Sequence, residues 1–198
     1  MTKLVFASLA AMAALAGCTQ TVVSPVSVTR FVAPQPAQLG RGTIAVRAAP
    51  GVPGNTLEFS QWQQSVAAEL SRLGYQVVPE GSVAGQHAEL RIERFIDTPE
   101  RRRGPVNVGV GGSTGSYGSG MGVGVGIDLS GPPPEVTANH LGVTIRDNGT
   151  GQALWEGRAE FSASRNSQYA GAQAAAQKMA AALFAGFPGE SGETIEVK

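Results

Sequence analysis

The 198-residue chain has one cysteine, two histidines and only 15% charged residues. A single cysteine excludes an intramolecular disulfide framework and a cysteine-rich zinc site. Basic and acidic residues number 15 each, so the basic footprint that general nucleic-acid binding requires is missing. The histidines, His87 and His140, stand far apart in the sequence and form no metal-binding motif. Each is therefore interpreted as a single histidine whose hydrogen bonds are satisfied within the protein, and not as a metal ligand. We therefore predict no catalytic, cofactor-binding or metal-binding residue, and no nucleic-acid partner.

Glycine, in contrast, is abundant, with 27 residues, and hydrophobic residues make up 42% of the chain. The glycine share is about double the usual one. The length suggests one domain that can bury a core without disulfides or metals.

Residues 1–17 read as a secretory signal peptide. Lys3 gives a short positive start, and an apolar run follows from Leu4 to Leu15. This run is too short for a membrane-spanning helix. The alternative, a buried N-terminal helix of a cytosolic protein, is the weaker interpretation.

Cys18 follows the signal directly, and the sequence Leu15-Ala16-Gly17-Cys18 resembles the lipobox of bacterial lipoproteins. The resemblance implies diacylglycerol on the thiol of Cys18, cleavage before it, and acylation of the new amine. Several acyl chains anchor a protein where a single chain does so only marginally. The alternative is a spare thiol after an ordinary signal. Thr19, where an Asp commonly retains lipoproteins in the inner membrane, implies an outer-membrane location facing the periplasm.

The mature chain divides into a tether at residues 18–42 and a single domain at residues 43–198. Three prolines in the tether disfavour a helix. Residues 26–32 alternate enough to form a first strand, and a flexible linker throughout remains an equal alternative.

Apolar residues of the domain recur with a period of two residues in some segments, as in strands, and of 3.6 residues in others, as in helices. Strands are predicted at residues 43–47, 75–78, 88–96, 136–147 and 153–163, and helices at residues 57–73 and 168–186. The first helix has an apolar face of Phe59, Trp62, Val66, Leu70 and Leu73, with Asn55 or Thr56 as its cap. The second has Tyr169, Ala172, Ala176, Met179, Leu183 and Phe187 on one face, with Ser164, Asn166 or Ser167 as its cap.

In the strand at residues 153–163, Trp155, Ala159 and Phe161 are expected to face the core. Leu154, Glu156, Arg158 and Glu160 have the opposite parity. Together these segments predict an α+β fold: an antiparallel or mixed sheet of about five to seven strands with two helices packed on one face.

The glycines are concentrated in residues 104–131, which contain 11 of the 27. Two stretches with period two flank a Gly/Ser tip at residues 112–120, which predicts a long hairpin with one apolar face and one nearly bare glycine face. Neither GxxxxGK[ST] nor a helix-opening GxGxxG is present, so a nucleotide loop is disfavoured. A membrane helix is disfavoured because the same glycines follow from alternation.

Arg101, Arg102 and Arg103, together with Arg91 and Arg94, form the main basic cluster of the sequence. Such a cluster fits contacts with phosphates of anionic phospholipid or lipopolysaccharide. A solvated loop balanced by nearby acidic residues is the favoured alternative.

Several motifs together resemble the DUF4136 lipoproteins of Gram-negative bacteria. They are TIAV, LEFSQWQQSVAAELSRLGYQV, a glycine-rich VGVG segment, IRDNGTGQALWEGRAEF and AALFAGFPGESG, of which LWEGRA and ALFAGFPG are the most specific. The resemblance covers most of the mature chain and implies no catalytic residues.

We expect a non-enzymatic binding or assembly module of the cell envelope, anchored through Cys18. The hairpin at residues 104–131 would be the surface for an envelope protein partner. The alternative is a structural protein that self-associates through this hairpin, and an envelope hydrolase is a weaker third hypothesis.

Overall fold

The computed structural model describes residues 21–34, 38–97, 106–115, 118–127 and 134–198. They belong to two units, which we describe separately. The first comprises residues 21–97 and 135–198, and the second contains the strands within residues 98–134.

The first unit is built on a seven-stranded mixed sheet. In spatial order its strands are β3 (Gln76–Val78), β2 (Thr43–Ala48), β4 (Gln86–Asp97), β7 (Val136–Asp147), β8 (Ala153–Ser164), β1 (Val26–Val32) and β9 (Thr194–Val197). Strand β2 runs parallel to both β3 and β4, whereas the other neighbours are antiparallel. The predicted α+β fold with a mixed sheet is therefore confirmed.

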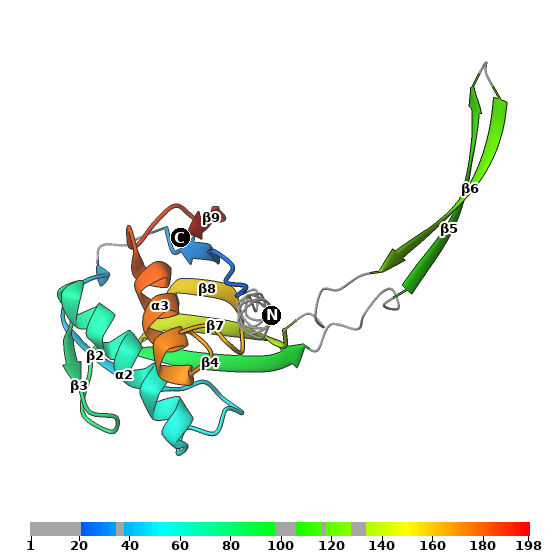
Figure 1. The fold of residues 1–198 in the computed structure, drawn as a ribbon. Helices are drawn as coiled ribbons and strands as arrows, with labels where there is room; N and C mark the ends of the chain where they lie inside the picture. The colour runs from blue at the N-terminus through cyan, green and yellow to red at the C-terminus, as the bar shows by residue number, and fades with distance from the viewer. Residues whose placement is uncertain (1–20, 35–37, 98–105, 116–117, 128–133) are drawn as a thin grey trace, which may run out of the picture. The chain divides into compact units, whose positions relative to one another are not determined.

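Two helices, α2 (Leu57–Arg72) and α3 (Ala172–Phe184), cover one face of this sheet (Figure 1). Helix α2 begins as predicted, because the hydroxyl of Thr56 accepts a hydrogen bond of 3.0 Å from the backbone N–H of Phe59. The predicted apolar stripe is buried against the sheet, with Trp62 and Leu70 fully inaccessible. Leu73, at the end of this stripe, is partly buried against the core.

Helix α3 begins at Ala172, later than the predicted start at residue 168, and its N-cap Gly171 makes no side-chain capping bond. The predicted caps are used differently. The hydroxyl of Ser164 bonds to Asn166, and that of Ser167 accepts from the N–H of Tyr169 at 3.2 Å. These local bonds hold the segment before the helix in turns.

The C-terminal end of α3 is held by a buried arginine from β1. Arg30 donates from Nε to the carbonyl of Leu183 at 3.0 Å and from Nη2 to those of Ala182 and Ala185 at 3.2 and 2.6 Å. A cation at this end stabilises the helix dipole and satisfies carbonyls left without intrahelical partners. Burial lowers the pKa of Arg30 from its ordinary value.

The second unit contains β5 (Val106–Gly115) and β6 (Gly118–Ile127), paired antiparallel with Val106 opposite Ile127. Residues 116–117, within the predicted tip, and the flanks at 104–105 and 128–131 lie outside the described residues. The glycine-rich hairpin as a unit therefore stays a prediction. In the described part of the chain, no helix has the length and apolar character needed to cross a membrane.

Candidate binding site

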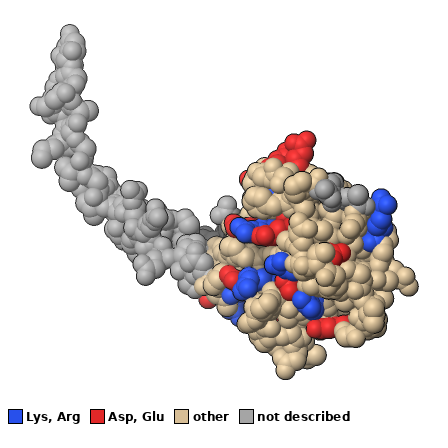
Figure 2. Space-filling view, turned by 180° about the vertical axis from the view of Figure 1, so that it is seen from behind, with Lys and Arg blue, Asp and Glu red and all other residues tan. Residues whose placement is uncertain are grey.

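The face of the sheet opposite the helices carries long charged side chains on its central strands. Because strand residues alternate between faces, β4, β7 and β8 send apolar residues under the helices and polar residues to this open face. Figure 2 views the molecule from behind and shows acidic and basic side chains intermixed on it.

The same pattern, Glu-x-Arg-x-Glu, occurs on both β4 and β8. The sheet register aligns the two copies across β7 into three rows of open-face residues. The histidine row holds Glu93, His140 and Glu160; the arginine row holds Arg91, Gly142 and Arg158; the threonine row holds Glu89, Thr144 and Glu156. Acidic and basic rows thus follow one another along the strands.

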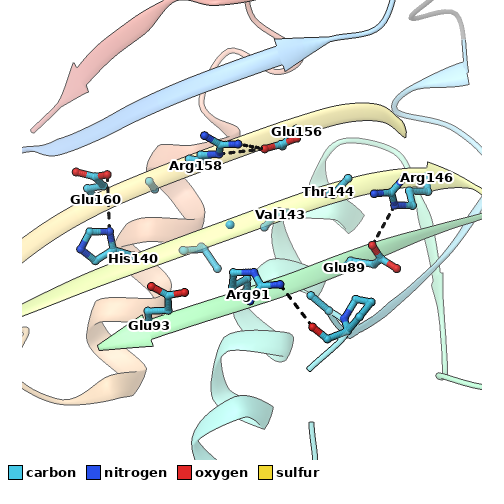
Figure 3. A pocket seen from close by; sticks show the side chains of 15 residues that line it. Glu89, Arg91, Glu93, His140, Val143, Thr144, Arg146, Glu156, Arg158 and Glu160 are labelled. Carbon is cyan, nitrogen blue, oxygen red and sulfur yellow. Dashed lines mark hydrogen bonds and ion pairs between the residues drawn. The ribbon is translucent and has the colours of Figure 1, made fainter. Parts of the chain in front are cut away.

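These rows line a half-open hollow of about 470 Å³ over β7 (Figure 3). Its walls are the charged side chains of β4 and β8, and its floor on β7 includes Gly142 and Thr144, which have no side chain or a short one. Small residues on the middle strand, between long residues on both neighbours, thus produce the depression.

A buried polar cluster closes one end of the hollow at Glu89. The carboxylate of Glu89 accepts from Arg47 at 2.8 Å and from Arg146 at 3.0 Å. Burial alone would raise the pKa of Glu89, but the bonds from these arginines outweigh it and hold the pKa below its ordinary value. Glu89 is therefore a fixed negative charge.

His87 belongs to the same cluster and is buried. Its Nδ1 is bonded to Oδ1 of Asn148, and its Nε2 lies 2.6 Å from Nη2 of Arg47. Because a guanidinium can only donate, Nε2 is the acceptor and the ring proton is on Nδ1. Each ring nitrogen is therefore satisfied, as expected from the sequence.

The opposite end of the hollow is formed by the histidine row. Nδ1 of His140 lies 3.7 Å from Oε1 of Glu160, and the ring packs edge-on against Phe95 at 5.7 Å. Glu93, on the other side of His140 in the register, is exposed and makes no ion pair among the described residues.

The arginine row lies between these ends. Arg158 donates to Glu156 on its own strand at 2.6 and 3.0 Å, and Arg91 reaches the carbonyl of Pro50 at 3.5 Å. No acidic side chain stands between the two arginines, because the middle position is Gly142.

The structure tests only some of the site residues expected from the sequence. Cys18 and Arg101–Arg103 lie outside the described residues. Arg91 and Arg94, which the sequence groups with Arg101–Arg103, lie on opposite faces of β4. Arg94 bonds under the helices to Asn139 at 2.8 Å and to Glu58 at 2.6 Å, whereas Arg91 lines the hollow. In the described ranges, no group of three or more His, Cys, Asp or Glu side chains is placed to hold a metal ion.

Sequence reasoning missed the hollow itself, although a signal was available. Glu156, Arg158 and Glu160 share one parity in the sequence, and the core-facing role of Trp155, Ala159 and Phe161 is confirmed by their burial. Leu154 has the parity of the charged residues but is buried, at the irregularity in the pairing of β7 with β8. The same Glu-x-Arg-x-Glu spacing occurs at residues 89–93. Comparison of the two strands would have revealed a repeated charged pattern.

Comparison with known proteins identifies relatives without an assigned activity. The family described as "Domain of unknown function (DUF4136)" matches residues 36–189. An uncharacterized protein of Zymomonas mobilis subsp. mobilis is 30% identical over 217 aligned positions, which cover 88% of this chain and 80% of that protein.

Among solved structures, similarity extends to the fold alone. A PDZ domain protein from Parabacteroides distasonis superposes with a TM-score of 0.50 at 17% identity over 96% of this chain. The chain spans only 42% of the length of that protein. A PelC dodecamer from Paraburkholderia phytofirmans gives a TM-score of 0.44 at 12% identity, covering 80% of this chain and 94% of that one.

Proposed function

The chain belongs to the DUF4136 family of unknown function, and we propose that it is a lipid-anchored, non-enzymatic binding module of the cell envelope. Its ligand occupies the hollow on the open face of the sheet. The observation that carries this proposal is the repeated Glu-x-Arg-x-Glu pattern, which lines both walls of the hollow over Gly142.

The arrangement of charge supports binding rather than chemistry. Glu89 is held ionised by two arginines, and Arg158 is paired with Glu156. Such mutually paired groups keep their charge and position, which suits selection of a complementary partner. General acid–base catalysis would instead favour a group whose pKa is moved toward the working pH.

The anchor rests on Cys18 and the lipobox. In cells fed a clickable palmitate analogue, the wild-type chain should incorporate label and sediment with outer membranes. The variant Cys18→Ser should do neither, because only a thiol receives the diacylglycerol. Equal labelling of both proteins would overturn the anchor while leaving the binding site untouched.

The binding surface is tested by photo-crosslinking in intact cells. A photoreactive amino acid at Thr144, inside the hollow, should give a discrete adduct. The same amino acid at Ser71, exposed on α2, serves as the control. The Thr144 adduct should disappear when Arg91 and Arg158 are both changed to Glu. Identical adducts from the two positions, or none from Thr144, would overturn the hollow as the binding surface.

The glycine-rich segment at residues 104–131 remains the second proposed contact surface, for an envelope partner or for a second copy of the chain. Its bare backbone permits close approach or strand addition. Deletion of residues 106–129 should remove a co-purifying partner. If the chain self-associates through this segment, the deletion should instead abolish the increase of the measured molecular mass with protein concentration. If neither changes while the sheet stays folded, this segment is not a contact surface.

A further inference from the structure

We infer that the hollow binds an extended peptide segment in which an acidic side chain is flanked, two residues away on each side, by basic side chains. The inference rests on the proposed binding role and specifies its ligand. It follows from how like charges are placed across the hollow, from the glycine at its centre, and from the spacing of the rows.

Each row sets like charges against each other across β7. Strands β4 and β8 are separated by two inter-strand spacings, or about 10 Å. At that distance like charges repel weakly through solvent, and an opposite charge between them stabilises both. In the histidine row the imidazole of His140 occupies the middle, with Nδ1 3.7 Å from Oε1 of Glu160, and in the threonine row Arg47 and Arg146 bond to Glu89.

The arginine row has no side chain at its centre, where Gly142 stands. Arg91 makes no ion pair among the described residues, and Arg158 shares a single carboxylate oxygen of Glu156. In this structure Arg91 reaches Pro50, and Arg158 bonds to Glu156 with its Cζ 5.8 Å from the ring centroid of Phe31. We expect a carboxylate seated over Gly142 to attract both guanidinium groups, whose planar forks suit bidentate contacts with carboxylates.

Gly142 is not required by the packing of the sheet. A Cβ built there would meet Cβ of Arg91 at 3.6 Å and the carbonyl oxygen of Arg91 at 3.9 Å, which are ordinary contacts. Its backbone does not have the positive φ that favours glycine. The glycine costs the strand conformational entropy without an evident structural gain. What it provides is open space between Arg91 and Arg158 (Figure 3).

The neighbouring rows select a peptide over a polyanion. Glutamates stand on both sides of the arginine row. Glu89 and Glu156 have arginine partners, so a ligand with several adjacent negative charges would be repelled mainly by Glu93 and Glu160 in the histidine row. Successive rows are two residues apart along the strands, or about 6.7 Å. Alternate side chains of any extended peptide have that same spacing. A peptide lying along β7 could therefore place one side chain over each row, with its acidic side chain over the arginine row and its basic side chains over the two rows that contain glutamates.

The test uses the full chain in nonionic detergent and fluorescently labelled synthetic peptides. A Lys-Thr-Glu-Thr-Lys peptide should bind about tenfold more tightly than its isomer Lys-Lys-Thr-Thr-Glu, because only the first matches the rows. Its affinity should fall as salt is raised. Equal affinity of the two isomers, or tighter binding of Glu-Thr-Glu-Thr-Glu, would overturn the inference.

Two variants connect binding to the hollow. Gly142→Val should fold normally and lose most of the affinity, because its side chain fills the central space. The double variant R91E and R158E should lose the Lys-Thr-Glu-Thr-Lys peptide and gain Lys-Thr-Lys-Thr-Lys. Arg41→Glu, which reverses an exposed arginine outside the hollow, should change neither. An Arg41→Glu effect as large as that of the double variant would also overturn the inference.

The two proposals fail in different ways. If the Thr144 adduct forms in cells but neither peptide isomer is preferred, the hollow is a binding surface and the peptide pattern is wrong. If the adduct is absent as well, both are wrong. An adduct consisting of two copies of this chain would replace the peptide with a second copy as the ligand.

Discussion

Among the glycines that the structure describes, Gly157 is the one where an added Cβ would meet the nearest atom. A Cβ placed on it would lie 2.2 Å from Cη2 of Trp155 and 2.8 Å from Cδ1 of Leu183. The indole of Trp155 stacks on Phe184 at 5.3 Å and donates its N–H to the carbonyl of Pro188 at 2.9 Å. The two most specific sequence motifs, LWEGRA and ALFAGFPG, therefore meet here for reasons of packing.

We expect Gly157→Ala to lower the free energy of unfolding by about 1–3 kcal/mol, because the added methyl must displace the indole or Leu183. Urea unfolding followed by tryptophan fluorescence measures this change. Gly142→Ala, also in the sheet, is the matched control, since a Cβ there makes only ordinary contacts, 3.6 Å from Cβ of Arg91, and the φ of Gly142 is not positive. Similar losses from both variants would contradict this account of Gly157.

Glu89 gives the protein a predictable dependence on pH. Its pKa is lower in the folded than in the unfolded state, so the folded protein binds this proton less readily. The resulting stability is complete above the ordinary glutamate pKa and is lost as the pH falls through the lower folded value.

Glu89→Gln should therefore be less stable than the wild type at neutral pH, by about 1–3 kcal/mol, because two guanidinium groups lose their charged acceptor. The difference should shrink on acidification. Chemical unfolding at several pH values from neutral to strongly acidic provides the measurement. A difference that stays constant over this range would show that the carboxylate charge is not responsible.

At the scale of elements, α3 depends on small side chains for its close packing. Ala175, Ala176 and Ala180 are essentially inaccessible to solvent, whereas Ala181 on the same helix is exposed. The sequence pattern predicted part of the buried face, because Ala176, Met179 and Leu183 recur at helical spacing and are buried. Ala172 is only partly buried, and Tyr169 and Phe187 lie outside the helix. The pattern did not predict the start of the helix, since the bonds of Ser164 and Ser167 to nearby polar groups are decided by the loop's conformation.

Ala176→Leu should destabilise the fold by about 1–3 kcal/mol, because the core offers no room for the additional methylene and methyl groups. Ala181→Leu makes the same chemical change on the exposed side of α3 and should change stability by less than about 0.5 kcal/mol. Thermal unfolding of both variants distinguishes burial from helix propensity. Equal effects would contradict the tight packing of α3.

For the whole molecule, what the sequence could predict depends on whether a feature is decided within one strand or between strands. Parity within one strand is local, so the inward positions of Trp155 and Phe161 could be read from the sequence, and their burial confirms them. Register between strands is not local. Nothing in residues 89–93 alone places Arg91 opposite Gly142 and, across it, Arg158. The open face is a product of this long-range pairing, so the hollow emerges only with the sheet.

The same pairing predicts that the connection between β4 and β7 is dispensable for the first unit. These strands pair along their full length, from Gln86 opposite Asp147 to Asp97 opposite Val136. The ends that residues 98–134 join are therefore already neighbours, and a short hairpin turn can connect them. Closing a shorter loop also costs less conformational entropy.

Replacement of residues 98–134 by Asn-Gly should leave the unfolding free energy of the seven-stranded sheet within about 1 kcal/mol of the wild type, or slightly higher. Urea unfolding followed by tryptophan fluorescence reports on this unit alone, because both tryptophans, Trp62 and Trp155, lie in its core. The hollow should keep its peptide preference, since all of its lining residues remain. A large loss of stability would mean that residues 98–134 are part of the cooperative fold, and a loss of peptide binding alone would assign them a share of the site.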